Sequence, residues 1–314
     1  MRQLSIKNGN RILCVSTVVM IAVQFLLAFI GIYDTLTMLL VSQVSLILIS
    51  FFGIWLSDVN MKEVLRIRPI NLRTFVFAFF MVFCSFPIVA LLNAISMLFV
   101  ENAVVDAATD MYRYGLGLSL FVMAVLPAIG EELLVRGVIY HSYREKSPVL
   151  AWILSAAIFG MLHMNFNQMP YAIYLGIVMV LMVEASDSIV TSMCMHFFVN
   201  GISTLSGYFS AEEMAMLAEE GFTAESVVGT GDAMVTTLMG MSVLSLIMIP
   251  LIVFILIGTC RVNHRSLVKA FRKAEPIYDR YALPEVQDEV KIIDIWFVIA
   301  VLIMVVITGF NTFA

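Results

Sequence analysis

Long apolar runs recur along almost the whole chain, and they limit its fold more than any other feature. The nine runs cover about residues 12–32, 36–57, 74–100, 115–140, 149–166, 170–185, 188–208, 234–259 and 294–313. A helix needs roughly 20 apolar residues to cross a bilayer, and the run at 170–185 is the shortest. Since 61% of the residues are hydrophobic and 13% are charged, the runs predict an all-α, polytopic bundle of about nine spans, with eight as the alternative, in a cell membrane.

The basic residues fall in alternate loops. Sixteen of the 18 lie at the N-terminus and in the loops at 58–73, 141–147 and 260–293. The opposite loops are acidic: they contain Asp34, Glu101, Asp106, Asp110, Glu212, Glu213, Glu219, Glu220, Glu225 and Asp232. The positive-inside rule therefore predicts a cytoplasmic N-terminus and an external C-terminus, which requires an odd number of spans.

Several functional classes find no support in the sequence. No basic tract is interleaved with aromatic residues, so we expect no nucleic-acid partner. The four cysteines stand singly in apolar runs, which indicates core residues and not a disulfide framework. The first run is too long for a signal-peptide core and lacks an A-x-A site, so we expect a retained span. We expect the acidic 209–233 segment to form a short amphipathic or disordered loop, and the basic 261–293 segment to form a helix on the inner leaflet or a solvated loop.

Three ionisable side chains interrupt the fourth run, within Gly130–Gly137. A charge at mid-bilayer costs roughly 2.5–3.5 kcal/mol, so these groups need partners, water or a function. Glu132 and Arg136 are spaced i, i+4 with the acid first, which predicts a buried ion pair. Glu131 is rotated about 100° from Glu132 and is free to face another helix. Pro127 and Gly130 weaken the helix just before it.

Two later runs supply matching polar pairs, Phe159-x-x-x-His163 and His196-x-x-x-Asn200. At about 1.5 Å per residue, these residues and Glu131 lie about 12–22 Å from the cytoplasmic ends of their helices, so all can meet in mid-bilayer. A lone His or Asn in a membrane helix is more often interhelical hydrogen-bond glue. Three separate spans contributing such groups favour a functional site instead. His141 and His264 lie in basic loops and receive no role.

The order Glu-Glu-x-x-x-Arg, Phe-x-x-x-His, His-x-x-x-Asn resembles the CAAX-protease and bacteriocin-processing family of intramembrane endopeptidases, which includes the type II CAAX prenyl endopeptidases. The resemblance covers about residues 115–205, a catalytic membrane core between three N-terminal spans (1–114) and a C-terminal part (206–314). The turn at 184–188 also fits the family's short hairpin. The resemblance implies that Glu131 and His163 activate water and that His196 and Asn200 form the oxyanion hole. Glu132, Arg136 and Phe159 would support the site.

We therefore predict an intramembrane peptidase that hydrolyses a peptide bond in a membrane-associated peptide or lipidated protein, such as a prenylated CAAX-type protein or a bacteriocin leader. The resemblance favours a glutamate-dependent mechanism without a cofactor. One alternative uses Glu131, His163 and His196 as zinc ligands, although no H-E-x-x-H is present. The other is a transporter or membrane scaffold.

Overall fold

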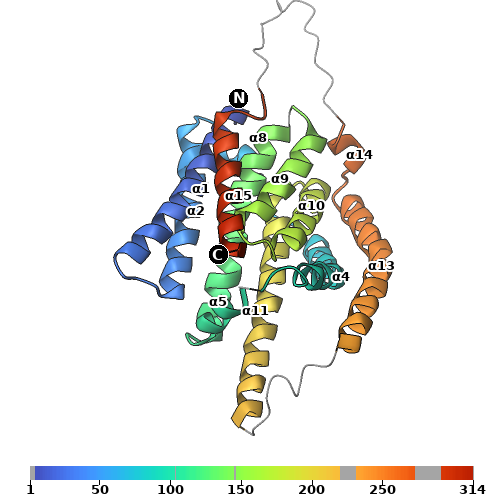
Figure 1. Ribbon diagram of the computed structural model, residues 1–314. Helices are drawn as coiled ribbons and strands as arrows, with labels where there is room; N and C mark the ends of the chain where they lie inside the picture. The colour runs from blue at the N-terminus through green and yellow to red at the C-terminus, as the bar shows by residue number, and fades with distance from the viewer. Residues whose placement is uncertain (1–3, 103, 145, 220–230, 273–290, 314) are drawn as a thin grey trace, which may run out of the picture.

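Figure 1 shows a computed structural model of the chain, in which the described residues form a bundle of helices without strands. The structure describes residues 4–102, 104–144, 146–219, 231–272 and 291–313. Its helices are α1 Ile6–Phe29, α2 Thr35–Leu56, α3 Met61–Leu65, α4 Leu72–Ser96, α5 Val104–Tyr112, α6 Leu116–Leu120, η1 Phe121–Val125, α7 Leu126–Glu132, η2 Leu133–Tyr140, α8 His141–Arg144, α9 Pro148–Leu162, α10 Met169–Ser186, α11 Ile189–Glu219, α13 Gly231–Val262, α14 Leu267–Ala270 and α15 Ile295–Phe313.

Eight of the described helical segments are long and apolar enough to cross a membrane. One of them, here called the central span, is the continuous segment Leu116–Arg144 formed by α6, η1, α7, η2 and α8. The all-α polytopic fold is therefore confirmed. The prediction that the run at 170–185 is the shortest was wrong, because it forms the 18-residue α10. The shortest helix among the nine runs is α9, which has only 15 residues and comes from the run at 149–166.

The polar sequence after α9 explains why this helix ends early. At about 1.5 Å per residue, α9 is about 22 Å long, less than the roughly 30 Å of a bilayer core. His163 is its C-cap, and Met164 adopts a positive φ of 46°. Asn165 Oδ1 then accepts hydrogen bonds from the backbone N–H groups of Asn167 (2.8 Å) and Gln168 (3.2 Å). The chain therefore turns inside the bundle, and α10 starts there with Pro170 in its first turn.

The helix starts follow local chemistry in the sequence. Ser147 caps α9, where its Oγ accepts from Leu150 N at 3.3 Å and Pro148 occupies the first turn.

α9 and α10 pack closely because Gly176 carries no side chain: a Cβ there would lie 2.9 Å from Ala156 Cα.

A cluster of charges, here called the basic-end network, ties the loops together at one end of the bundle. Glu184 is fully buried and pairs with Arg66 (2.5 Å), Arg144 (3.1 Å) and Arg265 (3.7 Å). Asp187, in left-handed conformation at the end of α10, also pairs with Arg66 and Arg265. Burial alone would lower the pKa of Arg66, but the two carboxylates outweigh it and raise that pKa. The basic loops therefore share one end, with the N-terminus, α8 and α14 (Figure 1).

Two predicted loops differ from the structure. α11 continues to Glu219, so the first half of the 209–233 segment is helical, while residues 220–230 lie outside the described residues. In the 261–293 segment only α14, with four residues, follows α13, and residues 273–290 lie outside the described part. The predicted hairpin at 184–188 is present, because α11 begins at Ile189 directly after Asp187 and Ser188.

Candidate active site

The central span is irregular on both sides of Glu131. A π-helical turn, η1, precedes α7, and a second, η2, follows it. Pro127 lies in the first turn of α7, where it donates no backbone hydrogen bond and its ring crowds the preceding turn. π-helical turns inside α-helices often mark functional sites, and here they bracket the acidic pair. The expected weakness of the helix around Pro127 and Gly130 is thus visible as a change of helical pitch.

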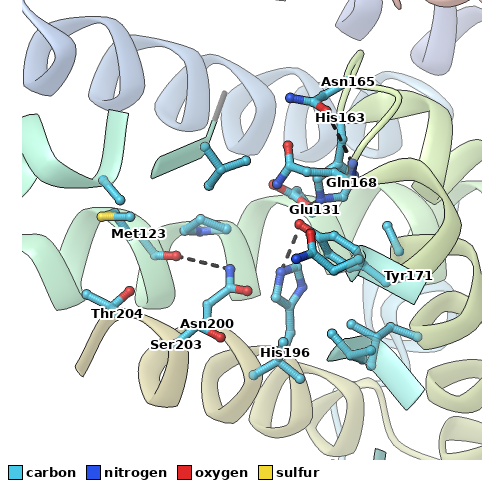
Figure 2. Close-up of a pocket in the computed structure, with 18 of the residues that line it drawn as sticks. Met123, Glu131, His163, Asn165, Gln168, Tyr171, His196, Asn200, Ser203 and Thr204 are labelled. Carbon is cyan, nitrogen blue, oxygen red and sulfur yellow. Dashed lines mark hydrogen bonds and ion pairs between the residues drawn. The ribbon is translucent and has the colours of Figure 1, made fainter. Parts of the chain in front are cut away.

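Three helices bring their polar side chains to one point. Glu131 comes from the central span, His163 from the end of α9 and His196 from α11. Glu131 Oε2 lies 4.0 Å from His163 Nε2 and 3.9 Å from His196 Nε2. Figure 2 shows the three side chains turned toward one another. Glu131 Oε2 is buried and accepts no hydrogen bond from any described residue.

The outer nitrogens of both imidazoles have partners that fix their protonation when the rings are neutral. His163 Nδ1 lies 2.8 Å from the carbonyl oxygen of Phe159, and His196 Nδ1 lies 3.0 Å from Glu132 Oε1. Both oxygens can only accept, so both Nδ1 atoms carry the hydrogen. The two Nε2 atoms are then acceptors, and they face a third acceptor, the carboxylate of Glu131. The centre of the site is therefore suited to a molecule that donates hydrogen bonds.

Glu132 and Arg136 support this centre from behind. Both side chains are fully buried, and Arg136 Nη1 lies 2.6 Å from Glu132 Oε1, so the expected ion pair is present. Arg136 also lies over the Phe159 ring, 4.3 Å from its centroid. The Phe159 ring also makes T-shaped contacts with both imidazoles, and its centroid lies 5.2 Å from that of His163 and 5.5 Å from that of His196. One buried assembly thus holds both histidine rings.

A residue that the sequence analysis did not identify completes the surroundings of Glu131. Gln43, in α2, donates from Nε2 to Glu131 Oε1 at 3.2 Å. α2 can approach because residue 130 is glycine: a Cβ there would lie 3.0 Å from Ile47 and 3.3 Å from Gln43 Oε1. The sequence could have drawn attention to Gln43, because it is a polar residue inside the apolar run at 36–57. Nothing in the sequence indicated that it contacts Glu131.

Asn200 lies one turn beyond His196 on α11 and lines the same cavity. Its Nδ2 donates to the carbonyl oxygen of Met123, in η1, at 3.0 Å (Figure 2). An amide nitrogen has two hydrogens, so the second remains available to a bound group. The hydrogen bond to Met123 fixes the orientation of the side chain, as an oxyanion donor requires.

The converging residues lie at one end of a cavity of about 530 Å³, here called the catalytic cavity after the role proposed for it below. It extends past Asn200 to Thr204 on α11, to Asn93 near the end of α4 and to Ala107 on α5. These positions lie toward the end of the bundle occupied by α5 and the last turns of α11 (Figure 1). The basic-end network lies at the opposite end, so the described cavity reaches toward the acidic loops and not toward the basic ones.

The residues proposed as zinc ligands do not fit a metal ion as they are placed. Zinc bonds of about 2.0–2.2 Å in tetrahedral geometry put neighbouring ligand atoms about 3.3 Å apart. The distances from Glu131 Oε2 to the two Nε2 atoms are 0.6 Å or more beyond this. Within the described residues, no group of three His, Cys, Asp or Glu side chains is arranged to hold a metal.

Comparison with known families identifies the same part of the chain. A family model described as type II CAAX prenyl endopeptidase Rce1-like matches residues 114–202. No curated protein and no solved structure matches the chain. The matched segment contains the central span, α9, α10 and the first turns of α11, and therefore every residue from Glu131 to Asn200 that converges on the catalytic cavity. The resemblance to this family of intramembrane endopeptidases is confirmed over the segment that carries the site.

Proposed function

We propose that this multi-pass membrane protein is an intramembrane endopeptidase of the cell membrane, with Glu131 as its general base. One observation carries the proposal: a buried, unpartnered oxygen of Glu131 faces two imidazole acceptors at one end of a cavity. Each Nε2 is too far from the carboxylate for a direct hydrogen bond. A water molecule between them can donate to two of the three acceptors and reach a substrate carbonyl with its lone pair.

Water attack then follows ordinary general-base chemistry. Glu131 accepts a proton from the water while His163 Nε2 accepts its other hydrogen bond, and the hydroxide oxygen bonds to the carbonyl carbon. The C–N bond breaks when the protonated Glu131 returns this proton to the leaving nitrogen. The products are a carboxylic acid and an amine, so the water is consumed and Glu131 is regenerated. Gln43, bound to the other carboxylate oxygen, keeps Oε2 directed at the water.

The oxyanion of the tetrahedral intermediate needs donors, and Asn200 supplies one through its second amide hydrogen. His196 supplies the other only when it is protonated at Nε2, because its neutral form is an acceptor there. Glu132 Oε1, 3.0 Å from His196 Nδ1, orients the ring so that Nε2 faces the cavity. Arg136 and Phe159 are positioning residues: Arg136 holds Glu132 from outside the cavity lining, and Phe159, which lines the cavity, packs against the two imidazole rings without offering a polar group.

The substrate that fits is a peptide bond in a membrane-associated peptide or lipidated protein. Part of the wall of the catalytic cavity is apolar and includes Phe86, Val89, Val104 and Val122. Such a wall suits a lipid chain or apolar side chains beside the scissile bond. The family match favours the same substrate class.

The decisive variant is Glu131→Gln, which preserves shape and removes the base. In proteoliposomes supplied with farnesylated CAAX-type peptides, we expect hydrolysis to fall by about 10²–10⁴-fold. Glu63→Gln, at an exposed site in α3, is the matched control and should leave the rate unchanged. Because the natural substrate can differ from this peptide, membrane peptides from cells carrying wild-type or Glu131→Gln protein should be compared in parallel. Undiminished hydrolysis by Glu131→Gln would contradict the proposal.

The proposed chemistry also predicts independence from zinc. The purified protein should contain well under one equivalent of zinc and keep its activity after prolonged chelation. His163→Asn should lower activity while His264→Asn, a control at an exposed position with positive φ, should not. Loss of activity on chelation that returning zinc reverses would replace the water-activation step and leave the peptidase assignment intact.

A further inference from the structure

A second cavity adjoins the catalytic cavity at the end of the bundle that carries the acidic loops. Its volume is about 770 Å³, and Asn165 lines both cavities. Its polar lining consists mainly of Glu101, Asn102, Asp106, Asn165, Asn167 and Asn311. It lies between the segment leading into α5, the turn after α9 and the end of α15. This cavity, here called the polar vestibule, plays no part in the water-activation chemistry.

One side chain of the polar vestibule points to a missing partner. Asn167 is 1% exposed, and its Nδ2 donates to Ser96 Oγ at 2.9 Å. Its Oδ1 is buried and has no hydrogen-bond partner. A buried acceptor without a partner is unfavourable, so a ligand that brings a hydrogen-bond donor gains that interaction. The acceptor belongs to the same turn that places His163.

The walls of the polar vestibule are held in place before any ligand binds. Asn311, near the end of α15, donates from Nδ2 to the carbonyl oxygen of Met164 at 3.0 Å. Ser96, at the end of α4, donates from Oγ to the carbonyl oxygen of Asn167 at 3.0 Å. α4 and α15 are thus both bonded to the turn after α9. A preorganised site loses less conformational entropy on binding.

The charge of the polar vestibule has one sign. Glu101 and Asp106 are exposed in its lining, and neither forms an ion pair with a described residue. Among the described residues, no lysine or arginine lines either cavity. A cleft with low-dielectric walls and charges of one sign concentrates the field and attracts the opposite charge. Amide oxygens beside these carboxylates are acceptors that suit the N–H groups of Lys or Arg.

We propose that the polar vestibule binds a cationic segment, with Lys or Arg side chains, that flanks the scissile bond of the peptide substrate. The segment enters from the end of the acidic loops, and its apolar or lipidated neighbour occupies the catalytic cavity. A free C-terminal carboxylate would be repelled from the polar vestibule, so the C-terminus of the substrate lies outside it. The inference rests on the proposed peptidase function and adds the charge of its substrate.

Binding to the Glu131→Gln variant tests this charge preference without requiring turnover. The probes are three palmitoylated fluorescent peptides, identical except for a Lys-Lys, Ser-Ser or Glu-Glu pair on one side of the candidate bond. In nanodiscs of neutral lipid, we expect the Lys-Lys peptide to bind about tenfold more tightly than Ser-Ser, and Glu-Glu more weakly than both. The preference should shrink as salt is raised, because exposed charges are screened.

Two charge-matched variants locate the preference. Glu101→Gln with Asp106→Asn, in the Glu131→Gln background, should reduce the Lys-Lys advantage to about twofold or less. Glu212→Gln with Glu213→Gln removes the same charge from exposed positions of α11 that do not line the cavity, and should preserve the advantage. Equal affinities for the three peptides, including no measurable binding of any, would overturn the proposal. So would an advantage that survives the first pair and disappears with the second.

Cleavage by the wild-type protein separates this proposal from the function on which it rests. If the Lys-Lys peptide binds preferentially and none of the peptides is cleaved, the proposed cationic subsite is supported and the proposed peptidase function is contradicted. Cleavage of all three peptides with equal kcat/KM and equal Kd would leave the peptidase in place and refute the cationic subsite.

Discussion

Removal of the Arg136 side chain should destabilise the protein more than any change at an exposed charge. Arg136 forms its ion pair with Glu132 at 2.6 Å, with both side chains fully buried. Arg136→Ala leaves the carboxylate of Glu132 in the bundle interior, where His196 Nδ1 still lies 3.0 Å from Glu132 Oε1. Breaking a buried pair in this way costs about 3–5 kcal/mol, because the remaining charge is uncompensated.

Two further contacts of Arg136 place the expected loss within this range. The guanidinium stacks over Phe159 at 4.3 Å, and a desolvated cation–π contact contributes about 2 kcal/mol. Nη2 also donates weakly to the carbonyl oxygen of Gly176 at 3.4 Å. We therefore expect a loss of at least 3 kcal/mol, a large share of the roughly 5–15 kcal/mol that stabilises a folded protein.

The assay is reversible unfolding in mixed micelles, with helicity and folded fraction followed as the denaturing detergent is increased. Arg113→Ala is the matched control, since Arg113 is exposed and its pair with Asp110 at 3.3 Å should be worth less than about 1 kcal/mol. The double variant Glu132→Leu with Arg136→Met removes both charges and keeps the volume. It should recover about 3 kcal/mol relative to Arg136→Ala, because no charge remains buried alone.

The double variant should nevertheless be inactive, since Glu132 no longer binds His196 Nδ1. Stability and activity therefore separate in this comparison. A stability of Arg136→Ala within 1 kcal/mol of the wild type would refute the reasoning. A double variant no more stable than Arg136→Ala would show that lost packing, and not an uncompensated charge, causes the defect.

Two other expectations concern topology and packing. In a cysteine-free protein, single cysteines at the positions of Lys62 and Asp106 should react with an impermeant reagent from opposite sides of the membrane, position 62 from the cytoplasm. Labelling of both positions from one side would contradict the orientation predicted from the basic loops. Gly176→Ala should destabilise the α9–α10 contact by about 1–3 kcal/mol, since its Cβ would lie 2.9 Å from a backbone atom, whereas Gly240→Ala, with nothing within 4 Å, should be neutral or stabilising in detergent unfolding.

The ends of the apolar runs were predictable because local composition decides them, but the course of α9 was not. Runs at 149–166 and 170–185 look alike in hydropathy, so length alone favoured the first as the full span. The outcome depends on Asn165 and Asn167, whose side chains bond within the turn and to α4. Those tertiary bonds let a polar turn lie inside the bundle, where hydropathy alone predicts continued helix.

In the candidate site, too, contacts between residues close in sequence were predictable, and contacts between residues far apart in sequence were not. The i, i+4 spacing predicted the Glu132–Arg136 pair, and the helical period placed Glu131 on another face. Gln43 binds Glu131 across 88 residues of sequence, and the basic-end network joins Arg66 to Glu184 across 118. No periodicity connects residues so far apart. Their pairing appears only when α2 and α3 are packed against the core that contains the motifs.

Adjacent glutamates with different tasks explain why the motif needs both. Glu132 accepts from Arg136 and His196 through Oε1, so its charge is committed to structure. Glu131, one position earlier and about 100° around the helix, accepts from the amide of Gln43 through Oε1 and keeps Oε2 for the cavity. We therefore propose that Glu132 orients the site and that Glu131 transfers the proton, and an exchange of these roles would require turning the helix by about 100°.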